Sequence, residues 1–197
     1  MSLEKRRRVV DDPVVIRALA HPLRLKLREL IGREGALTAA QAARVLGISQ
    51  ALASHHLRQL AKYGFVEQAP ASDNRERPWR VTATSFSWGP AVAEAEGSAA
   101  ADVLEQIVAQ RALANLEGWQ RRRGGEDAVW RDNSGIGQSL VYLTADELAE
   151  LRRGLDALID PLVARRPLGD AGARPKGARP VDLTIICTPV EATPSGG

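Results

Sequence analysis

Basic and polar side chains gather on one side of the segment from Gln50 to about Tyr63. At about 100° per residue, a helix over this segment has an apolar side and an opposite side that is small near its start and basic towards its end. The apolar side consists of Ala53, Leu57 and Leu60, and the opposite side of Ala51, His55, Arg58 and Lys62. A helix with such a face fits the major groove, which is about 12 Å wide, and reaches base edges and phosphates. The spacing therefore predicts contacts with nucleic acid.

The same residue types do not assemble a catalytic site. Ser54 and His55 are adjacent, so on a helix their side chains diverge by about 100° and cannot pair as nucleophile and base. Asp146 and Glu147 are explained by the start of a helix, where acidic residues complement the helix dipole. The sequence contains neither a phosphate-cradling glycine motif nor a nucleophile elbow. We therefore expect no enzymatic activity and no cofactor.

Two successive helices are predicted ahead of this segment. The first begins at Pro13, and it is interrupted at His21 because proline disfavours helix in the residue before it. The second begins at Pro22, since proline is well placed in a first helical turn. Leu23, Leu27, Leu30 and Ile31 recur on one face of it. These helices supply the apolar surface on which the Gln50 helix can pack.

A short helix and a glycine turn lead directly into the Gln50 helix. Thr38 is a plausible N-cap for a helix over 39–46, and Gly47 can take the left-handed conformation that ends it. Ser49 is then a good N-cap for the helix that begins at Gln50. Gly64 is again a stop signal. The pattern predicts two helices joined by a tight turn.

Two short strands follow, over 65–67 and 79–82, and the turn formers of 69–78 lie between them. The order of helices, turn and hairpin predicts a helix-turn-helix with a wing. The fold class is therefore mainly α with a small β component (α+β): a winged helix-turn-helix domain, a long helix and a small C-terminal α+β region.

Three landmarks resemble one known family. They are Ala-His-Pro-Leu-Arg at 20–24, Ser-His-His-Leu at 54–57 and Tyr-Gly-Phe-Val at 63–66. Together, over about residues 12–82, they resemble the winged helix-turn-helix of ArsR/SmtB-type bacterial regulators. The resemblance implies contacts to bases or to the DNA backbone from Thr38, Gln41, Gln50, Ser54, His55 and Arg58. It further implies phosphate or minor-groove contacts from Arg75, Arg77 and Arg80, with Lys62 also on phosphate. His56 lies on the flank of the apolar side and is interpreted as structural.

The chain departs from that family in its sensor chemistry. Metal-sensing members resemble one another in paired cysteines on the short helix, or in His and Asp pairs on the long one. Here residues 37–41 contain no thiol, residues 98–123 contain neither His nor Cys, and Cys187 is the single cysteine of the sequence. Soft or borderline metals need several such ligands together. We therefore expect no metal site.

Charge divides the chain into a basic front and an acidic back. Residues 1–80 contain 15 Lys and Arg against 8 Asp and Glu, and residues 81–197 contain 12 against 16. The front half thus favours an anionic partner, namely double-stranded DNA. We expect a basic flexible tail over 1–11, the winged helix-turn-helix domain over 12–96, a dimerisation and possible effector region over 97–190, and a disordered tail over 191–197. No signal peptide or membrane span is indicated, so we expect a cytoplasmic protein.

The back half is expected to form a homodimer. A long helix over 98–123 occupies the place where the resembling family uses a dimerisation helix, and palindromic operators require a twofold protein. Beyond it we predict a strand over 139–143, a helix from Thr144, a loop over 167–180 and a strand over 181–190. Four aromatic residues could line a pocket for an unknown effector, or fill a small core: Trp88, Trp119, Trp130 and Tyr142. Cys187, in an apolar strand, is interpreted as an inert buried thiol.

The sequence thus predicts a dimeric, sequence-specific DNA-binding transcriptional regulator, acting as a repressor by analogy with the family. The alternative is a winged-helix module used for protein contacts, with weak or no specific DNA binding.

Overall fold

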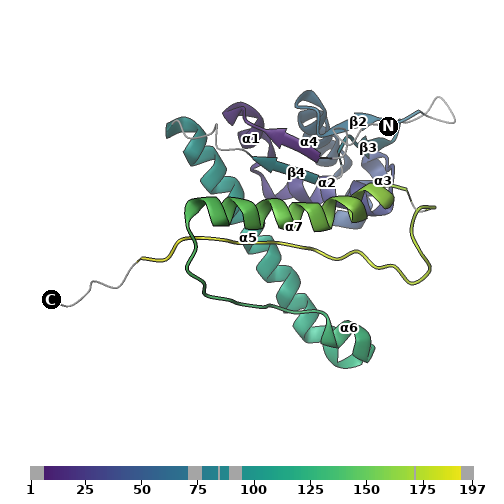
Figure 1. Cartoon of the computed structure of the whole chain (residues 1–197). Coiled ribbons are helices and arrows are strands. Elements are labelled where there is room, and N and C mark those ends of the chain that lie inside the picture. Colours follow the sequence, from purple (N-terminus) through teal and green to yellow (C-terminus); the bar gives the residue numbers. More distant parts are fainter. Residues whose placement is uncertain (1–6, 71–76, 84, 89–94, 171, 192–197) are drawn as a thin grey trace.

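A computed structural model describes residues 7–70, 77–83, 85–88, 95–170 and 172–191. The chain is mainly helical, with a small β component, and its front part is a winged helix-turn-helix (Figure 1). The elements, in chain order, are β1 (Arg7–Val10), α1 (Pro13–Leu19), α2 (Pro22–Glu34), α3 (Ala39–Leu46), α4 (Gln50–Lys62), β2 (Val66–Gln68), β3 (Trp79–Val81), β4 (Ser85–Trp88), α5 (Ala95–Arg122), the 3-10 turn η3 (Arg123–Gly125), α6 (Ala128–Asp132) and α7 (Ala145–Arg165).

The first helices begin where local side chains satisfy their free amides. Asp12 accepts a hydrogen bond from the Val14 amide at 2.8 Å, and proline occupies the first turn of α1. The Nδ1 atom of His21 accepts from the Leu23 amide at 3.1 Å, so a histidine caps α2. Each cap supplies an acceptor to one of the orphan donors of a helix N-terminus. The break between the two helices at His21 is as predicted.

The core of the front part is formed by the inward faces of α1, α2, α3 and α4. Its fully buried side chains include Ile16, Leu27, Ile31, Leu57 and Leu60. The first half of α5 closes this core by packing on α1, and Ala100, Ala101 and Leu104 are its buried residues there. The apolar faces predicted for α2 and α4 are therefore confirmed.

The hairpin of the wing is built on the end of α4. β2 and β3 are antiparallel, with Val66 opposite Val81, Glu67 opposite Arg80 and Gln68 opposite Trp79. Leu37, just before α3, exchanges backbone hydrogen bonds of 3.0 and 2.7 Å with Trp79. This bridge attaches the hairpin to the start of the helix-turn-helix, so the wing and α3–α4 are held as one unit.

The sequence interpretation of residues 1–11 as a flexible tail is wrong for the part that the structure describes. Residues 7–10 form β1, which pairs in parallel with β4, and the sequence analysis predicted neither strand. Arg8 holds β1 in place: its guanidinium donates to the Tyr63 carbonyl at 2.7 Å and lies 4.6 Å from the Phe65 ring centroid. A basic residue near the N-terminus is thus tied to the C-terminal end of α4.

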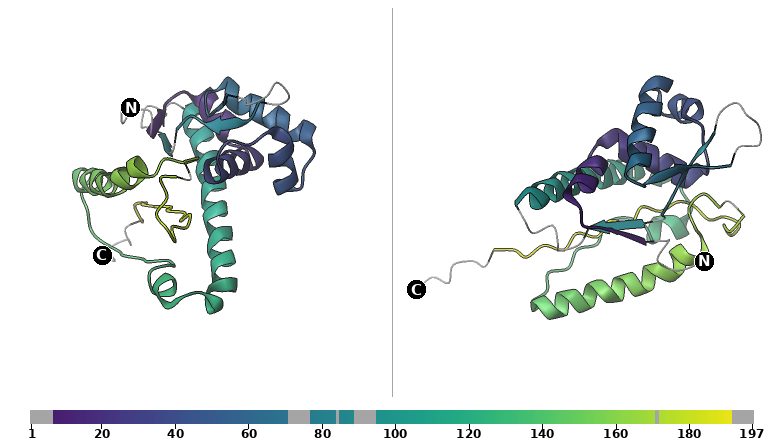
Figure 2. Two further views of the ribbon diagram at one scale, coloured as in Figure 1. Left: turned by 90° about the vertical axis from the view of Figure 1, so that its right-hand side faces the viewer. Right: turned by 90° about the horizontal axis from the view of Figure 1, so that it is seen from above.

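In the back half, the two long helices were predicted, the short α6 was not, and the two predicted strands are wrong. α5 begins at Ala95, a little before the predicted start, and leads away from the winged helix-turn-helix to α6 at its far end (Figure 2). α7 begins at Ala145, one residue after the predicted start, and its N-cap Thr144 forms a capping box with Glu147. Residues 139–143 and 181–190, however, are extended chain without strand pairing in the part of the chain that is described. A strand exists only where a second strand pairs with it.

The expected aromatic cluster is also absent from the described side chains. Trp119 and Trp130 are half-buried and each lies beside an arginine, Arg122 and Arg179 respectively. Tyr142 is fully exposed, and the side chain of Trp88 lies outside the described residues. Cys187 is half-buried in extended chain, so the interpretation as a thiol buried in a strand is wrong. Among the described residues, no helix is long and apolar enough to cross a membrane.

Candidate nucleic-acid interface

The turn between α3 and α4 sets the direction of α4. Gly47 ends α3 at a φ of 64°, a left-handed conformation that glycine adopts without a Cβ penalty. The Ile48 amide then donates to the Ala43 carbonyl at 3.0 Å. Ser49 caps α4, because its hydroxyl accepts from the Leu52 amide at 3.2 Å. These local bonds fix the angle at which α4 leaves the turn. The Gly47 stop and the Ser49 cap were predicted from the residue types, whereas the bond from Ile48 to Ala43 was not.

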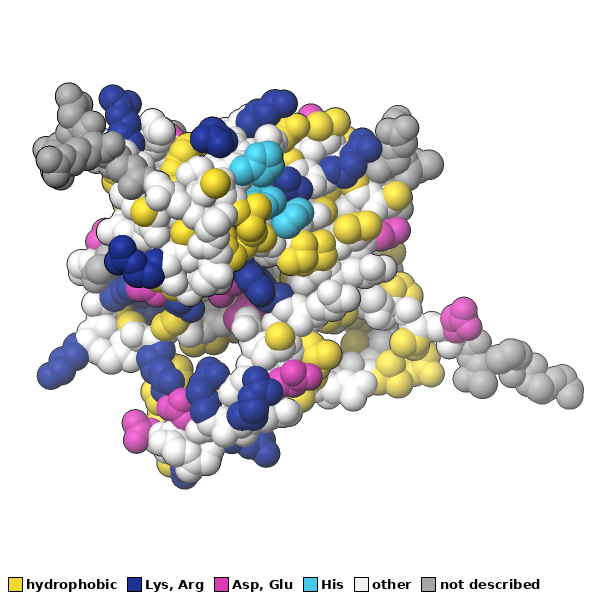
Figure 3. Space-filling view, turned by 180° about the vertical axis from the view of Figure 1, so that it is seen from behind, with side chains coloured by type: hydrophobic (Ala, Val, Ile, Leu, Met, Phe, Trp, Pro, Cys, Tyr) yellow, Lys and Arg dark blue, Asp and Glu magenta, His cyan; other side chains and the backbone are white. Residues whose placement is uncertain are grey.

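The outer side of α4 carries the predicted base-reading residues. Its buried side consists of Ala53, His56, Leu57 and Leu60. Gln50, His55, Arg58 and Lys62 are exposed, and Ser54 is half-buried. One helix therefore presents two cations and three hydrogen-bonding side chains to solvent, which matches what a groove-reading helix needs. In the space-filling view, histidines lie on a face with several Lys and Arg side chains (Figure 3).

The side chains of Thr38 and Gln41 cap the N-terminus of α3. The Thr38 hydroxyl accepts from the Gln41 amide at 3.2 Å, and Oε1 of Gln41 accepts from the Thr38 amide at 2.8 Å. This reciprocal pair is a capping box, which the sequence analysis did not identify at this helix. Both residues lie at the start of α3, and the amide nitrogen of the Gln41 side chain can still donate to a phosphate.

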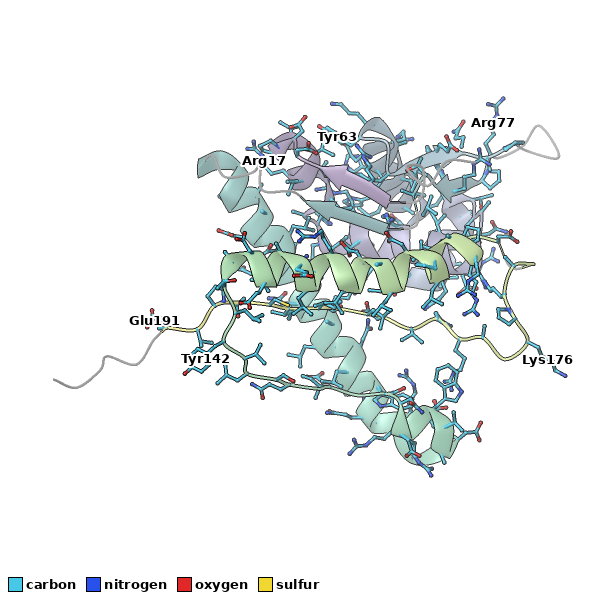
Figure 4. All side chains as sticks on the ribbon, in the orientation of Figure 1. Arg17, Tyr63, Arg77, Tyr142, Lys176 and Glu191 are labelled. Atoms are coloured by element: carbon cyan, nitrogen blue, oxygen red, sulfur yellow. The ribbon has the colours of Figure 1, made fainter. Side chains whose placement is uncertain are left out.

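The three wing arginines are not equivalent. Arg75 lies outside the described residues. Arg77 is exposed just before β3 and projects outward at the hairpin (Figure 4). Arg80 instead forms a salt bridge of 2.8 Å with Glu67, its partner across the hairpin. A phosphate that contacts Arg80 must therefore compete with a carboxylate, which the sequence analysis did not consider.

A histidine pair joins the buried side of α4 to the start of α2. The ring centroids of His21 and His56 are 4.6 Å apart, and the side chain of His56 is buried. Burial lowers the pKa of both imidazoles below their usual value. The nearby Arg24 lowers the pKa of each further, because one more positive charge there is unfavourable. His56 is thus a structural residue, as predicted, and it favours the neutral form.

Sequence reasoning missed one exposed apolar residue on α4. Leu52 is 41% exposed near the start of the helix, where a groove-reading helix approaches the bases. Apolar side chains at such positions contact the methyl group of thymine. The signal was available, because Leu52 falls about 100° away from Ala53 and off the Leu57–Leu60 side.

Metal-binding chemistry is not assembled in the described part of the chain. No group of three or more His, Cys, Asp or Glu residues there could hold a metal ion. The His21–His56 pair lacks a third ligand among the described residues, and Nδ1 of His21 already caps α2. The candidate interface is therefore characterised by hydrogen-bonding side chains and positive charge and not by metal ligands.

Residues 19–69 match the model of a family described as a helix-turn-helix domain. These residues include α2, α3, α4 and β2, and they amount to less than half of the chain. The match agrees with the α3–turn–α4 geometry described above. No curated protein matches the chain.

Several solved structures resemble the chain at low identity. Wild-type MarR from E. coli in its apo form is 20% identical over 76% of this chain and 88% of that chain, with a TM-score of 0.31. A cysteine-to-serine variant of E. coli MarR in complex with operator DNA is 19% identical over 74% and 84%, also with a TM-score of 0.31. The heme sensor protein PefR, in complex with heme and carbon monoxide, is 17% identical over 74% and 76%, with a TM-score of 0.31.

Proposed function

We propose that this protein is a sequence-specific DNA-binding transcriptional regulator. The observation that carries the proposal is the outer side of α4, where Gln50, His55, Arg58 and Lys62 are exposed on a helix whose opposite side is buried in the core. The match of residues 19–69 to a helix-turn-helix domain supports it.

Each exposed group has a proposed role in this interface. Gln50, Ser54 and His55 read base edges from the N-terminal half of α4, because that half of a recognition helix enters the major groove. Arg58 contacts a base or the backbone deeper along the helix, and Lys62 neutralises a phosphate. Thr38 and Gln41 reach the DNA backbone from the start of α3. Arg75, Arg77 and Arg80 contact phosphate or the adjacent minor groove from the wing.

The finer parts of the proposal rest on the three sequence landmarks. On these landmarks we propose that the protein is of the ArsR/SmtB type, that it forms homodimers with α5 in the interface, and that it represses transcription. The second half of α5 leads away from the core and leaves Leu113 56% exposed, which suits a helix that packs on a second copy. Repression is checked by measuring transcription from the bound promoter with and without the protein.

The proposal is tested by binding to a fragment of the protein's own promoter and to random DNA of equal length, at several salt concentrations. We expect tighter binding to the promoter and a steep salt dependence, since each neutralised phosphate releases counterions. Arg58→Ala should lower the affinity. Arg121→Ala removes the same charge from an exposed position at the end of α5, and it should have little effect. Absence of both sequence preference and salt dependence refutes the proposal and supports the protein-interaction alternative.

The absence of a metal sensor is tested in the same assay. Because no cluster of metal ligands lies in the described residues, micromolar zinc should leave the protein bound to its promoter. Clean release by zinc contradicts this expectation.

A further inference from the structure

The first turn of α4 is open to solvent at three consecutive positions. Gln50, Ala51 and Leu52 are all exposed, and no other run of three exposed residues occurs along this helix. The side chain of Leu52 is 41% exposed. Leu46 and Ile48, the apolar residues that precede it at the turn, are by contrast partly buried against the core. The chain therefore leaves a leucine in water at the end of α4 that the proposed interface uses.

Capping of the helix does not explain this leucine. Leu52 occupies the third position after the N-cap Ser49, where a Gln or Glu side chain can complete a capping box. α3 and α7 have such residues at that position, Gln41 and Glu147. Leu52 contributes only its backbone amide, which donates to the Ser49 hydroxyl at 3.2 Å. Any residue other than proline supplies that amide, so the apolar side chain has no part in the cap.

Leu52 lies beside a residue that is proposed to read bases. Leu52 and His55 are three positions apart on α4, so their side chains are neighbours on the helix surface, and His55 is exposed. Ala51 is exposed and small, which lets this turn approach the floor of a groove closely. All three residues belong to the N-terminal half of α4, the part of a recognition helix that contacts base edges. A helix placed in the major groove by His55 therefore brings Leu52 to the bases as well.

The major groove offers a leucine only one favourable partner. Every base edge there presents hydrogen-bond donors or acceptors, and thymine alone adds an apolar group, its C5 methyl. An apolar side chain set against the polar atoms of other bases displaces water without replacing its hydrogen bonds, which is unfavourable. Gln50, in the same turn, is of the residue type that pairs with adenine through two hydrogen bonds. Both Gln50 and Leu52 thus favour A·T base pairs.

We infer that Leu52 recognises thymine through its C5 methyl group, so that the operator of this protein carries a thymine where the first turn of α4 enters the major groove. The inference rests on the proposed function, and it adds an apolar determinant of specificity to the polar base contacts proposed for Gln50, Ser54 and His55. One methyl group withdrawn from water against a leucine changes the affinity about fourfold. An operator with two half-sites doubles the free energy of the contact, which corresponds to about fifteenfold.

The experiment removes the methyl group from the DNA and, separately, the leucine from the protein. One probe is a fragment of the protein's own promoter. The other is the same fragment synthesised with deoxyuridine in place of thymidine, which removes the C5 methyl groups and keeps every hydrogen-bonding group of the bases. Random DNA of equal length, made in both forms, controls for effects of the replacement on the duplex itself. Fluorescence anisotropy at one fixed salt concentration measures the dissociation constant for each duplex.

Two variants are compared with the unmodified chain. Leu52→Ala removes the apolar side chain, and α4 should remain folded because alanine is the stronger helix former. Val45→Ala is the matched control, since Val45 is 60% exposed near the C-terminal end of α3. The first helix of such a motif crosses the DNA backbone and does not read bases. Circular dichroism and urea denaturation check that both variants keep the helical content and the stability of the unmodified chain.

We expect the unmodified chain and Val45→Ala to bind the thymidine promoter about four- to fifteenfold more tightly than the deoxyuridine promoter. Leu52→Ala should bind both promoters alike, with the affinity that the unmodified chain has for the deoxyuridine form. The two forms of random DNA should bind equally weakly.

The inference is overturned if the unmodified chain prefers its promoter to random DNA but binds the thymidine and deoxyuridine promoters equally. It is also overturned if Leu52→Ala distinguishes the two promoters as well as the unmodified chain does. A chain without any preference for its promoter over random DNA refutes the proposed function and the inference together, so the two failures are distinguishable.

Discussion

The salt bridge between Glu67 and Arg80 offers a direct test of the wing. The two side chains face each other across the hairpin at 2.8 Å, and they are 51% and 54% exposed. Exposed pairs of this kind are worth about 0.2–1 kcal/mol. A phosphate bound to Arg80 would also lie roughly 6 Å from the Glu67 carboxylate, and in water that repulsion is about 0.7 kcal/mol. Glu67→Gln removes both the competition of the Glu67 carboxylate for Arg80 and its repulsion of the phosphate. Together these contributions amount to about 0.9–1.7 kcal/mol, so we expect DNA binding to tighten by roughly five- to twentyfold.

The assay is fluorescence anisotropy with a labelled promoter duplex at several salt concentrations. In Glu67→Gln the salt slope should steepen by up to about one unit, because Arg80 becomes free to neutralise a phosphate. The double variant Glu67→Gln/Arg80→Ala should lose the gain. Glu34→Gln is the matched control, since Glu34 is also an exposed carboxylate paired with an arginine at 2.8 Å. It lies at the end of α2. Unchanged affinity in Glu67→Gln, or a gain that persists in the double variant, refutes the phosphate contact of Arg80.

Three further predictions concern the recognition helix and its support. His55→Ala should reduce discrimination between promoter and random DNA, whereas Arg77→Ala should weaken binding to both alike; equal loss of specificity in competition assays contradicts these roles. Leu57 is fully buried in α4, so Leu57→Ala should lower the free energy of unfolding by about 2–5 kcal/mol, as measured by urea denaturation. Burial lowers the pKa of His21 and of His56 in the folded chain. Just below the usual histidine pKa of about 6.5, the unfolded chain therefore binds more protons than the folded chain. The free energy of unfolding should therefore fall as the pH drops from about 7 through the folded-state pKa values. If the dependence of the free energy of unfolding on pH is the same in His56→Gln as in the unmodified chain, His56 does not contribute to it.

Much of the front part could be predicted because its signals are local. Thr38, Ser49 and Gly47 act within one turn of their own position, so their capping roles follow from residue type. The buried side of α4 follows from the 3.6-residue period alone. The parallel pairing of β1 with β4 could not be predicted in this way, since it joins segments more than 70 residues apart and depends on Arg8 reaching the end of α4.

The back half shows the opposite case. Residues 139–143 and 181–190 have the composition of strands, and composition predicts strands wherever a partner exists. The described chain provides none, so the segments are extended and unpaired. Most of their apolar side chains, and Leu151, Leu158 and Leu162 of α7, remain exposed for the same reason.

The amino-acid sequence by itself determined the helices, their caps and the basic outer side of α4, because these depend on residues within a few positions of one another. Only the tertiary structure decided what each exposed cation faces. It sets Arg80 opposite Glu67 by strand register, places Arg8 on the Tyr63 carbonyl and leaves the outer side of α4 clear of the core. Such contacts depend on where distant parts of the chain come together, and that is fixed by packing of the whole core.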